Sequence, residues 1–251
     1  MCGLTAVYYS EATSRPPAIE TSGMLGATLA NIQHRGPDSN GLWVSPDLSV
    51  GLGHARLSII DLEHGQQPLS DEDELIHCVV TGEIYDYLRE DPRELIAQGS
   101  TFKTKSDPEL VVQRFIYKHH GFDLLSSLRG EFAFVLYDSR RRLMFSARDR
   151  LGIKPLYHTI SAGRLLIASE MKAFLPFGWK PEWDIDSIVH NGDFSNDRTV
   201  FKGVNKVNTY YSKGGRCLTC GLVDGRPLTL VSPNGIYQRA VILGHHLLCC
   251  R

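Results

Sequence analysis

The sequence has 251 residues, 42% of them hydrophobic and 22% charged, which is typical of a soluble globular protein made of one large domain or of one domain with an appendage. The formal net charge of -1 gives no electrostatic reason to expect a nucleic acid or an anionic membrane as partner. Because no apolar run is long enough to span a bilayer and the N-terminus lacks the features of a signal peptide, we expect a cytoplasmic protein whose thiols stay reduced.

Short apolar runs and one helical pattern fill the first part of the chain. Residues 3–9 form an apolar run that predicts a buried strand directly after Cys2. Apolar residues at helical spacing predict a helix over 19–32, and Gly36-Pro37 would end it. Three further strands are expected at 42–44, 50–53 and 77–80, the last ending at Thr81-Gly82-Glu83.

The middle of the chain combines helix signals with frequent strands. A helix is expected at 84–89, and Ser106 with Glu109 forms a capping box that starts a second helix, with Pro108 in its first turn. Four more strands are expected at 128–137, 143–147, 156–159 and 165–168. Strands are frequent and helices are grouped between them. This pattern favours an α+β fold, in which helices cover the outer faces of two sheets, and argues against a doubly wound parallel sheet.

The composition changes near residue 208. Residues 208–251 hold five basic residues, one acidic residue and four of the six cysteines, whereas residues 1–207 carry 22 Lys and Arg against 27 Asp and Glu. We therefore divide the chain into a domain at 1–207 and an unassigned, cysteine-rich basic tail at 208–251.

Cys2 is the first candidate for chemistry. Removal of Met1, which is usual when the second residue is small, would leave Cys2 with both a thiol and the α-amine of the chain. An α-amine has an ordinary pKa near 7.7–8.0, so a useful fraction is neutral and can accept the thiol proton. One residue would then supply the nucleophile and the base together. A cysteine at position two can also occur by chance, so Cys2 alone does not decide the function.

Eight stretches in order along the chain carry a resemblance to a known family: residues 1–3, 35–38, 53–61, 82–85, 106–107, 129–133, 147–157 and 168–173. Together they resemble the class II (N-terminal nucleophile) glutamine amidotransferase domain and, within that class, the glutaminase domain of asparagine synthetase. The resemblance runs from residue 1 to about residue 207. It implies a four-layer αββα sandwich and the hydrolysis of L-glutamine to glutamate and ammonia through a Cys2 thioester, for asparagine biosynthesis.

The resemblance also implies how glutamine is held. Arg56 would grip the α-carboxylate, for which a planar guanidinium is suited because it can bind both oxygens. Asp107 would take the α-ammonium, and Glu83 would share it or hold the neighbouring loop. Without the resemblance, Arg56 reads as a surface ion-pair partner and Asp107 as a first-turn acid that stabilises its helix. Four residues would line the pocket with main-chain contacts: Leu57, Ser58, Ile59 and Ile60.

One departure from the family bears on activity. The family has Asn-Gly-Glu where this chain has Thr81-Gly82-Glu83, and the Asn amide and Gly N–H form the oxyanion hole. The Gly82 N–H is retained, but Thr81 offers a shorter side chain with one hydroxyl. Loss of such a donor costs about 10²–10³ in turnover. We therefore expect a weakened glutaminase, in which Thr81→Asn would raise turnover with little change in glutamine binding.

The tail lacks the features of the second domain of asparagine synthetases, which binds ATP through a Ser-Gly-Gly-x-Asp-Ser loop. Residues 212–216 have two glycines but neither the Asp nor the closing Ser. We therefore expect a chain without a synthetase domain and without a cofactor of its own, ATP and magnesium being implied only for that domain. Cys217 and Cys220 have zinc-ligand spacing, but adjacent Cys249 and Cys250 do not, so we assign no metal site. We interpret residues 208–251 as an unselected extension of a truncated chain.

Three rival interpretations stay open. The chain could be a non-catalytic module that binds glutamine or pairs with a synthetase-bearing homologue, as Thr81 and the expected truncation suggest. It could be another class II amidotransferase, although the Gly-Glu-Ile-Tyr and Ser-Glu-Met-Lys-Ala stretches favour the asparagine synthetase type. It could also fail to fold stably, because the end of the domain is replaced. Apart from glutamine and such a homologue, we expect no nucleic-acid or membrane partner.

Overall fold

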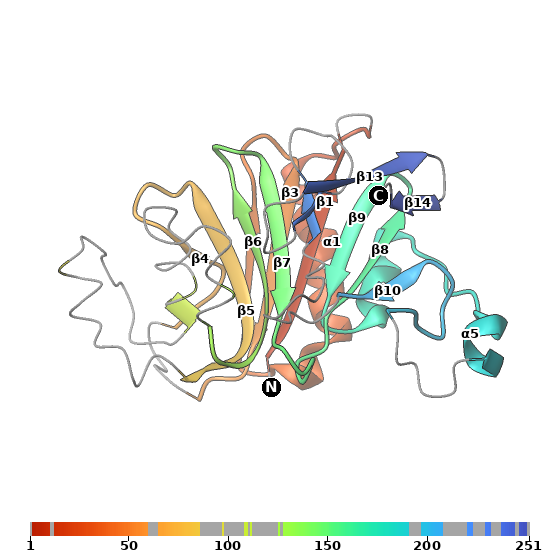
Figure 1. Cartoon of the computed structure of the whole chain (residues 1–251). Helices are drawn as coiled ribbons and strands as arrows, with labels where there is room; N and C mark the ends of the chain where they lie inside the picture. The colour runs from red at the N-terminus through yellow and green to blue at the C-terminus, as the bar shows by residue number, and fades with distance from the viewer. Residues whose placement is uncertain are drawn as a thin grey trace.

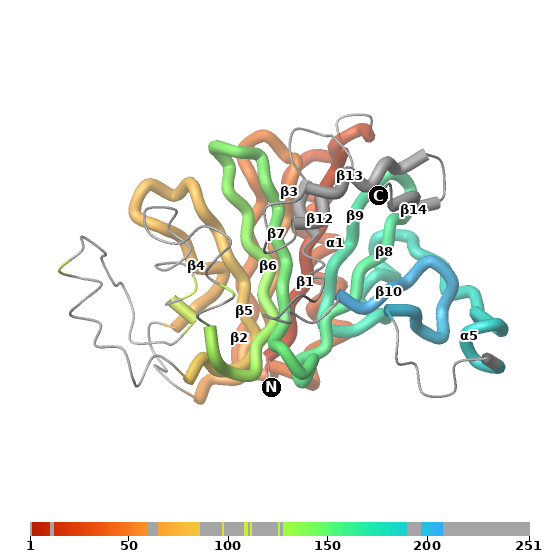
Figure 2. Tube along the Cα trace, in the orientation of Figure 1, coloured from red at the N-terminus to blue at the C-terminus, as the bar shows by residue number. Residues whose placement is uncertain are grey.

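The computed structural model describes residues 2–10, 13–59, 65–85, 97, 108–109, 111, 125, 128–190 and 197–207, and the backbone of 220–222, 229–231, 237–243 and 246–249. Within these residues the strands form two sheets that face one another (Figure 1). Figure 2 shows the chain path, with β6 (Gly130–Asp138) and β7 (Leu143–Arg148) in front of β1 (Gly3–Tyr9).

The first sheet contains the N-terminal strand near its middle. Strand β1 pairs antiparallel with β3 on one side and with β9 on the other, and every residue of β1 is buried, as its apolar sequence predicts. In sheet order the six strands are β10 (Val204–Lys206), β8 (Tyr157–Ser161), β9 (Arg164–Ala168), β1 (Gly3–Tyr9), β3 (Val50–Arg56) and β2 (Ser39–Val44).

The second sheet has a long antiparallel ladder between β5 and β6, which runs from Ile76 opposite Asp138 to Ile84 opposite Gly130. Strand β7 follows, and β11 pairs with it, so that part of the chain beyond residue 207 extends this sheet. In sheet order the eight strands are β4 (Leu69–Ser70), β5 (Ile76–Ile84), β6 (Gly130–Asp138), β7 (Leu143–Arg148), β11 (Cys220–Leu222), β12 (Thr229–Val231), β13 (Tyr237–Leu243) and β14 (His246–Cys249).

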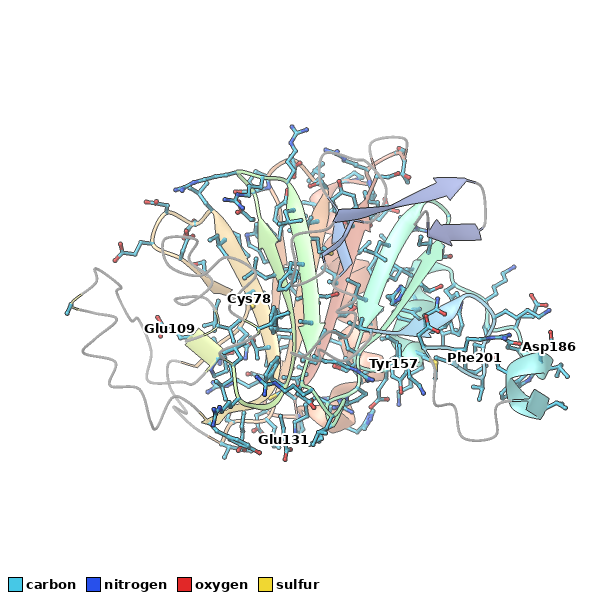
Figure 3. The ribbon with its side chains drawn as sticks, viewed as in Figure 1. Cys78, Glu109, Glu131, Tyr157, Asp186 and Phe201 are labelled. Atoms are coloured by element: carbon cyan, nitrogen blue, oxygen red, sulfur yellow. The ribbon has the colours of Figure 1, made fainter. Side chains whose placement is uncertain are left out.

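Three apolar clusters account for the layers. One cluster lies between the sheets and includes Leu4 and Leu52 from the first and Val79 and Val135 from the second. A second joins the first sheet to α1 (Ala18–Asn31) and to the 3-10 helix η4 (Met171–Phe177). The third packs the opposite face of the second sheet, where Cys78 lies (Figure 3), against the helical residues Val111 and Leu125. The expected four-layer αββα sandwich is confirmed.

Most expected elements are present; β2, β3 and β5 are longer than the sequence pattern indicates, β1 has the expected bounds, and β6 begins two residues later. The helix predicted over 19–32 is α1, followed by the 3-10 turn η1 (Gln33–Arg35) before Gly36-Pro37. The helix predicted at 84–89 is wrong at its start, because Ile84 completes β5 through its pairing with Gly130. Pro108, Glu109 and Val111 are helical as expected, whereas residues 86–89 and 106–107 lie outside the described residues.

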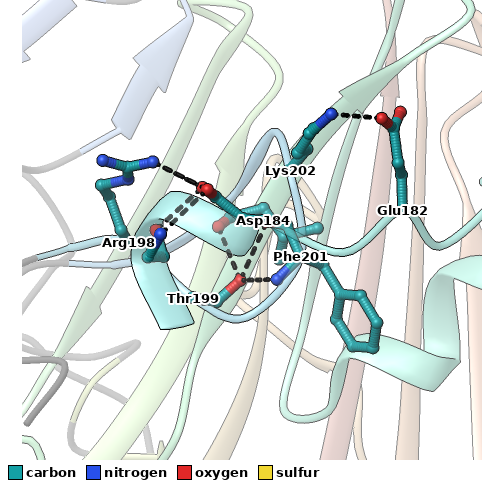
Figure 4. A network of polar contacts seen from close by, with 8 residues as sticks. Glu182, Asp184, Arg198, Thr199, Phe201 and Lys202 are labelled. Atoms are coloured by element: carbon teal, nitrogen blue, oxygen red, sulfur yellow. Dashed lines mark hydrogen bonds and ion pairs between the residues drawn. The ribbon is translucent and has the colours of Figure 1, made fainter. Parts of the chain in front are cut away.

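A separate polar network closes the corner beside α5 (Ile185–His190), as Figure 4 shows. Asp184 accepts hydrogen bonds from the Ser187 N–H at 3.1 Å and from Arg198 Nη2 at 2.9 and 2.7 Å, one to each carboxylate oxygen. The Thr199 hydroxyl donates to the Val204 carbonyl at 2.9 Å, and an exposed ion pair joins Glu182 to Lys202. The carboxylate of Asp184 thus caps the short helix and ties it to the returning chain.

In the part of the chain that the structure describes, none of the helices is both long and apolar enough to cross a membrane.

Candidate active site

Cys2 lies at the start of β1, where the β1–β3 pairing places it beside the chain that leaves β3. The pairing of Gly3 with Ala55 brings the Leu57 N–H to 3.3 Å from Cys2 Sγ, and the Leu57 carbonyl lies 3.6 Å from the same sulfur. Cys2 is half-buried. The Leu57 main chain thus contacts the sulfur with both its N–H and its carbonyl, and these contacts hold the thiol at the end of β3.

The main-chain carbonyl of Cys2 accepts two hydrogen bonds from different parts of the fold. The Thr81 hydroxyl, on β5 of the second sheet, donates to it at 2.8 Å. Arg35 Nε, on η1, donates to it at 3.0 Å. A carbonyl oxygen has two lone pairs, so these two donors satisfy it. They also fix the plane of the peptide that joins Cys2 to Gly3.

Arg35 is itself held by Glu170, which follows β9. Arg35 Nη1 lies 3.2 Å from Glu170 Oε1, which also binds His34 Nε2 at 2.9 Å, and Lys172 Nζ lies 3.2 Å from Oε2. Burial acts to raise the pKa of Glu170, but the hydrogen bonds from His34, Arg35 and Lys172 outweigh it and lower that pKa. Glu170 therefore stays ionised and keeps the Arg35 guanidinium pointed at Cys2.

Ser169 fixes the start of β1 from the same segment. Its hydroxyl accepts the Leu4 N–H at 3.0 Å, and its own N–H donates to the Leu4 carbonyl at 3.0 Å. Sequence reasoning assigned no role to Arg35, Ser169 or Glu170, although all three stand in stretches that carry the family resemblance. Arg35 and Ser169 act on main-chain atoms of Cys2 and Leu4, which leave no signature in a sequence, and Glu170 acts on Cys2 only through Arg35.

The residues expected to hold glutamine follow β3 toward the same place. Arg56 is buried at the end of β3, and its carbonyl accepts the Asp38 N–H at 3.0 Å. The Ser58 N–H donates to Asp38 Oδ2 at 2.7 Å, so the Gly36-Pro37-Asp38 turn supports the start of the pocket segment. Leu57 and Ser58 are half-buried and Ile59 is exposed, whereas Ile60 and Asp107 lie outside the described residues.

The Thr81-Gly82-Glu83 stretch lies inside β5 rather than at its end. Gly82 has a φ of 115°, and a Cβ built there would be 1.9 Å from the Glu131 carbonyl oxygen of the neighbouring strand β6. Only glycine fits at this position. The hydroxyl of Thr81, which we expected near the oxyanion, donates to the Cys2 carbonyl in this structure.

Glu83 is exposed and lies opposite Glu131 across the β5–β6 ladder. Glu131 binds Lys154 Nζ at 3.1 Å and accepts a hydrogen bond from the Tyr85 hydroxyl. The bond from Lys154, followed by that from Tyr85, lowers the pKa of Glu131. Figure 3 labels Glu131 at the lower edge of the molecule, the edge where Figure 1 marks the N-terminus. Glu83 thus adds negative charge at the end of the sandwich that holds Cys2.

His54, on β3, connects the two sheets through a contact with Val80, the residue before Thr81 on β5. His54 Nε2 lies 3.0 Å from the Val80 carbonyl, and Gln67 donates to the same carbonyl at 3.1 Å while accepting the Val80 N–H at 2.6 Å. Burial lowers the pKa of His54 to about 4, so the ring is neutral at pH 7. These contacts set the position of β5 against β3, and with it that of Thr81.

Comparison with solved structures shows the fold, and a family model shows the family. Glutamine phosphoribosylpyrophosphate amidotransferase from B. subtilis superimposes with a TM-score of 0.56 and 22% identity over 70% of this chain and 44% of that chain. The fold is therefore the N-terminal-nucleophile amidotransferase sandwich. Residues 1–213 match the family described as a glutamine amidotransferase domain, and the chain belongs to this family.

Relatives with curated names fall into two groups. Amidase chry2 of Gibberella zeae is 45% identical over 82% of this chain and 31% of its own length, and amidase chyE of Penicillium rubens is 48% identical over 72% and 26%. Asparagine synthetase [glutamine-hydrolyzing] 1 of Bacillus subtilis is 40% identical over 70% of this chain and 27% of its own length. The chain is thus related to the glutaminase part of asparagine synthetases, and it spans about a third or less of each of these relatives.

Proposed function

We propose that the chain hydrolyses L-glutamine to L-glutamate and ammonia, with Cys2 as the nucleophile. The observation that carries this proposal is the set of contacts on Cys2: Leu57 donates to its sulfur, and Thr81 and Arg35 donate to its carbonyl. Three elements that are distant in sequence converge on one residue and orient a half-buried thiol. A cysteine with only a packing role needs no such orientation, so the convergence supports catalysis.

In the proposed reaction Cys2, freed of Met1, transfers its thiol proton to its own α-amine, and the sulfur forms a bond to the amide carbon of glutamine. The tetrahedral oxyanion is held by the Gly82 N–H. The C–N bond then breaks as the α-ammonium gives its proton to the amide nitrogen, which leaves as ammonia. Water gives a proton to the α-amine and attacks the resulting thioester, the C–S bond breaks, the sulfur takes back that proton, and glutamate leaves. Water is the second substrate, and the reaction needs no cofactor.

Glutamine would be held by Arg56 at its α-carboxylate and by Asp107 at its α-ammonium, with Glu83 adding negative charge on the ammonium side. The position of Arg56 supports this assignment, because it is buried at the end of β3, two residues before Ser58 and one before Leu57. A buried guanidinium is suited to two-point binding of a carboxylate. Ser58 and Ile59 would contribute to the pocket, together with Ile60.

Two fates are open to the ammonia. Asparagine formation is one outcome, and it needs an ATP-dependent activity such as that of a synthetase-bearing homologue in the same compartment, which we expect to be the cytoplasm. Identities of 45 and 48% to chains named amidases favour a second outcome, in which cleavage of the amide is itself the function and the ammonia is released instead of being used. Both outcomes rest on the same glutaminase step.

The test is glutamate release from glutamine by the purified chain, with Cys2→Ala as control and with the N-terminal mass of both proteins checked. We expect release by the protein that begins at Cys2, at a rate reduced by the absence of an Asn at position 81, and none by Cys2→Ala. No release from a folded protein that begins at Cys2 would overturn the enzyme proposal. Binding of glutamine without turnover would then favour the non-catalytic module.

A further inference from the structure

We infer that Thr81 is a positioning residue: its hydroxyl holds the main-chain carbonyl of Cys2 and thereby orients the nucleophile, and it does not donate to the oxyanion. This inference rests on the proposed glutaminase function. It rests on one contact above all, the 2.8 Å hydrogen bond from Thr81 Oγ1 to the Cys2 carbonyl oxygen. The two residues belong to opposite sheets, so the bond fixes the nucleophile against the facing sheet.

A hydroxyl has a single proton, and the Cys2 carbonyl takes it here. Thr81 is 1% exposed, so no solvent competes for the hydroxyl. Threonine is also branched at Cβ, which restricts its side chain to few orientations. While the bond to Cys2 is made, Thr81 has no proton to offer to a tetrahedral intermediate, and main-chain donors must hold the oxyanion.

The neighbours of Thr81 hold it in place from both sides. Before it, Val80 is fixed at its carbonyl by His54 and Gln67 and at its N–H by Gln67 again. After it, Gly82 passes so close to the Glu131 carbonyl that no side chain fits. The direction of the Thr81 hydroxyl is therefore set by the strand, and the strand is set against β3 and β6.

Arg35 completes the arrangement, since its Nε reaches the same carbonyl oxygen at 3.0 Å. The two donors fill both lone pairs of the oxygen and so fix the orientation of the Cys2 peptide. The contact between the Leu57 N–H and Cys2 Sγ, at 3.3 Å, depends on that orientation. Loss of the Thr81 hydroxyl should therefore lower the reactivity of the sulfur itself, before any substrate binds.

This consequence separates the two roles. Alkylation by iodoacetamide forms the S–C bond as iodide leaves, and no oxyanion develops in that step. An oxyanion donor would change glutamine turnover and leave alkylation unchanged, whereas a positioning residue changes both. The variants are Thr81→Val, which keeps the shape and removes the hydroxyl, and Thr81→Ser, which keeps the hydroxyl.

Thr159→Val is the matched control. Thr159 is also a buried threonine whose hydroxyl donates to a main-chain carbonyl, that of Gly203 at 2.8 Å, but it lies on β8, away from Cys2. Because the chain has six cysteines, alkylation is followed at the N-terminal peptide by mass spectrometry, in protein that begins at Cys2. Thermal unfolding of every variant shows which proteins are folded.

In Thr81→Val we expect alkylation of Cys2 to slow by about three- to tenfold, as the loss of one hydrogen bond predicts, with kcat for glutamine falling in parallel and KM little changed. Thr81→Ser and Thr159→Val should keep the original alkylation rate.

Alkylation at the original rate in Thr81→Val would overturn the inference, and a fall in kcat alone would assign the hydroxyl to the oxyanion. Slowed alkylation without glutamine turnover in any variant would sustain the positioning role and refute the glutaminase. Should Thr81→Val not fold, Thr81→Ala gives the same comparison.

Discussion

Two polar networks in this molecule look alike but differ in what they leave unpaired. Around Asp184, both carboxylate oxygens, the Ser187 hydroxyl and the Thr199 hydroxyl have partners on neighbouring residues (Figure 4). Around Cys2, by contrast, two buried nitrogens have no hydrogen-bond partner among the described residues: Arg35 Nη2 and His54 Nδ1. The first network joins a helix to a strand, and the second surrounds a thiol.

The difference agrees with a functional role for the network around Cys2, as the proposed function requires. A buried polar atom without a partner costs free energy, so a fold that keeps one retains the group for another purpose or fills the space with water. Arg35 already makes two bonds, to the Cys2 carbonyl and to Glu170, and its guanidinium as a whole places a positive charge beside Cys2. The corner at Asp184 needs nothing beyond its own residues.

The largest effect should come from removing one arginine from each network. Arg35→Ala deletes a charged donor to the Cys2 carbonyl, and such a bond contributes about 1.5–3 kcal/mol, so kcat should fall about 10- to 100-fold. Arg198→Ala breaks the contact with Asp184 but should leave kcat unchanged while lowering the melting temperature. Steady-state glutaminase kinetics and thermal unfolding of both variants measure these effects.

Equal losses of kcat in the two variants would contradict the comparison, since they would show that turnover follows general stability. Arg35→Ala with normal kcat would mean that Thr81 alone suffices to hold the Cys2 carbonyl.

The second prediction concerns the response of the site network to pH. Burial, with a smaller contribution from Arg56, lowers the pKa of His54 to about 4, whereas an unfolded chain binds this proton near 6.5. The stability from neutral His54 is therefore fully present above pH 6.5 and is lost as the pH falls toward 4, by roughly 3 kcal/mol. His54→Gln, which can still donate to the Val80 carbonyl, should flatten this part of the curve of unfolding free energy against pH. An unchanged slope between pH 6.5 and 4 would mean that His54 binds its proton equally well in the folded chain.

The sequence predicted the strands well and the contacts between them poorly. The runs at β1, β6 and β9 are apolar on successive residues, so their burial on both faces could be inferred from the chain alone. The end of β5 could not, because Ile84 stays in the strand only through its pairing with Gly130.

The site shows the same limit. Cys2, Arg56 and Gly82 belong to recognisable motifs, and their proposed roles come from the family resemblance. The actual partner of Thr81 is a carbonyl 79 residues away, directly before a strand of the other sheet. No spacing in the sequence indicates such a contact, because every residue has a carbonyl and only the fold decides which one lies within reach.

The smallest effect is expected at the corner network, in a different pH range. The hydrogen bond from Arg198, followed by those from the Ser187 N–H and hydroxyl, lowers the pKa of Asp184 to about 2, whereas an unfolded aspartate titrates near 3.9. Its contribution to stability is thus present above pH 3.9 and is lost as the pH falls toward 2. Asp184→Asn should flatten the curve of unfolding free energy against pH in this range only and leave glutaminase activity at pH 7 unchanged.

Arg198→Ala should flatten the curve in the same pH range, and the double variant should add little, because the two residues act through one contact. Additive effects of the two substitutions would show that the network is not a single unit, and a loss of kcat in Asp184→Asn would show that the corner is coupled to the nucleophile.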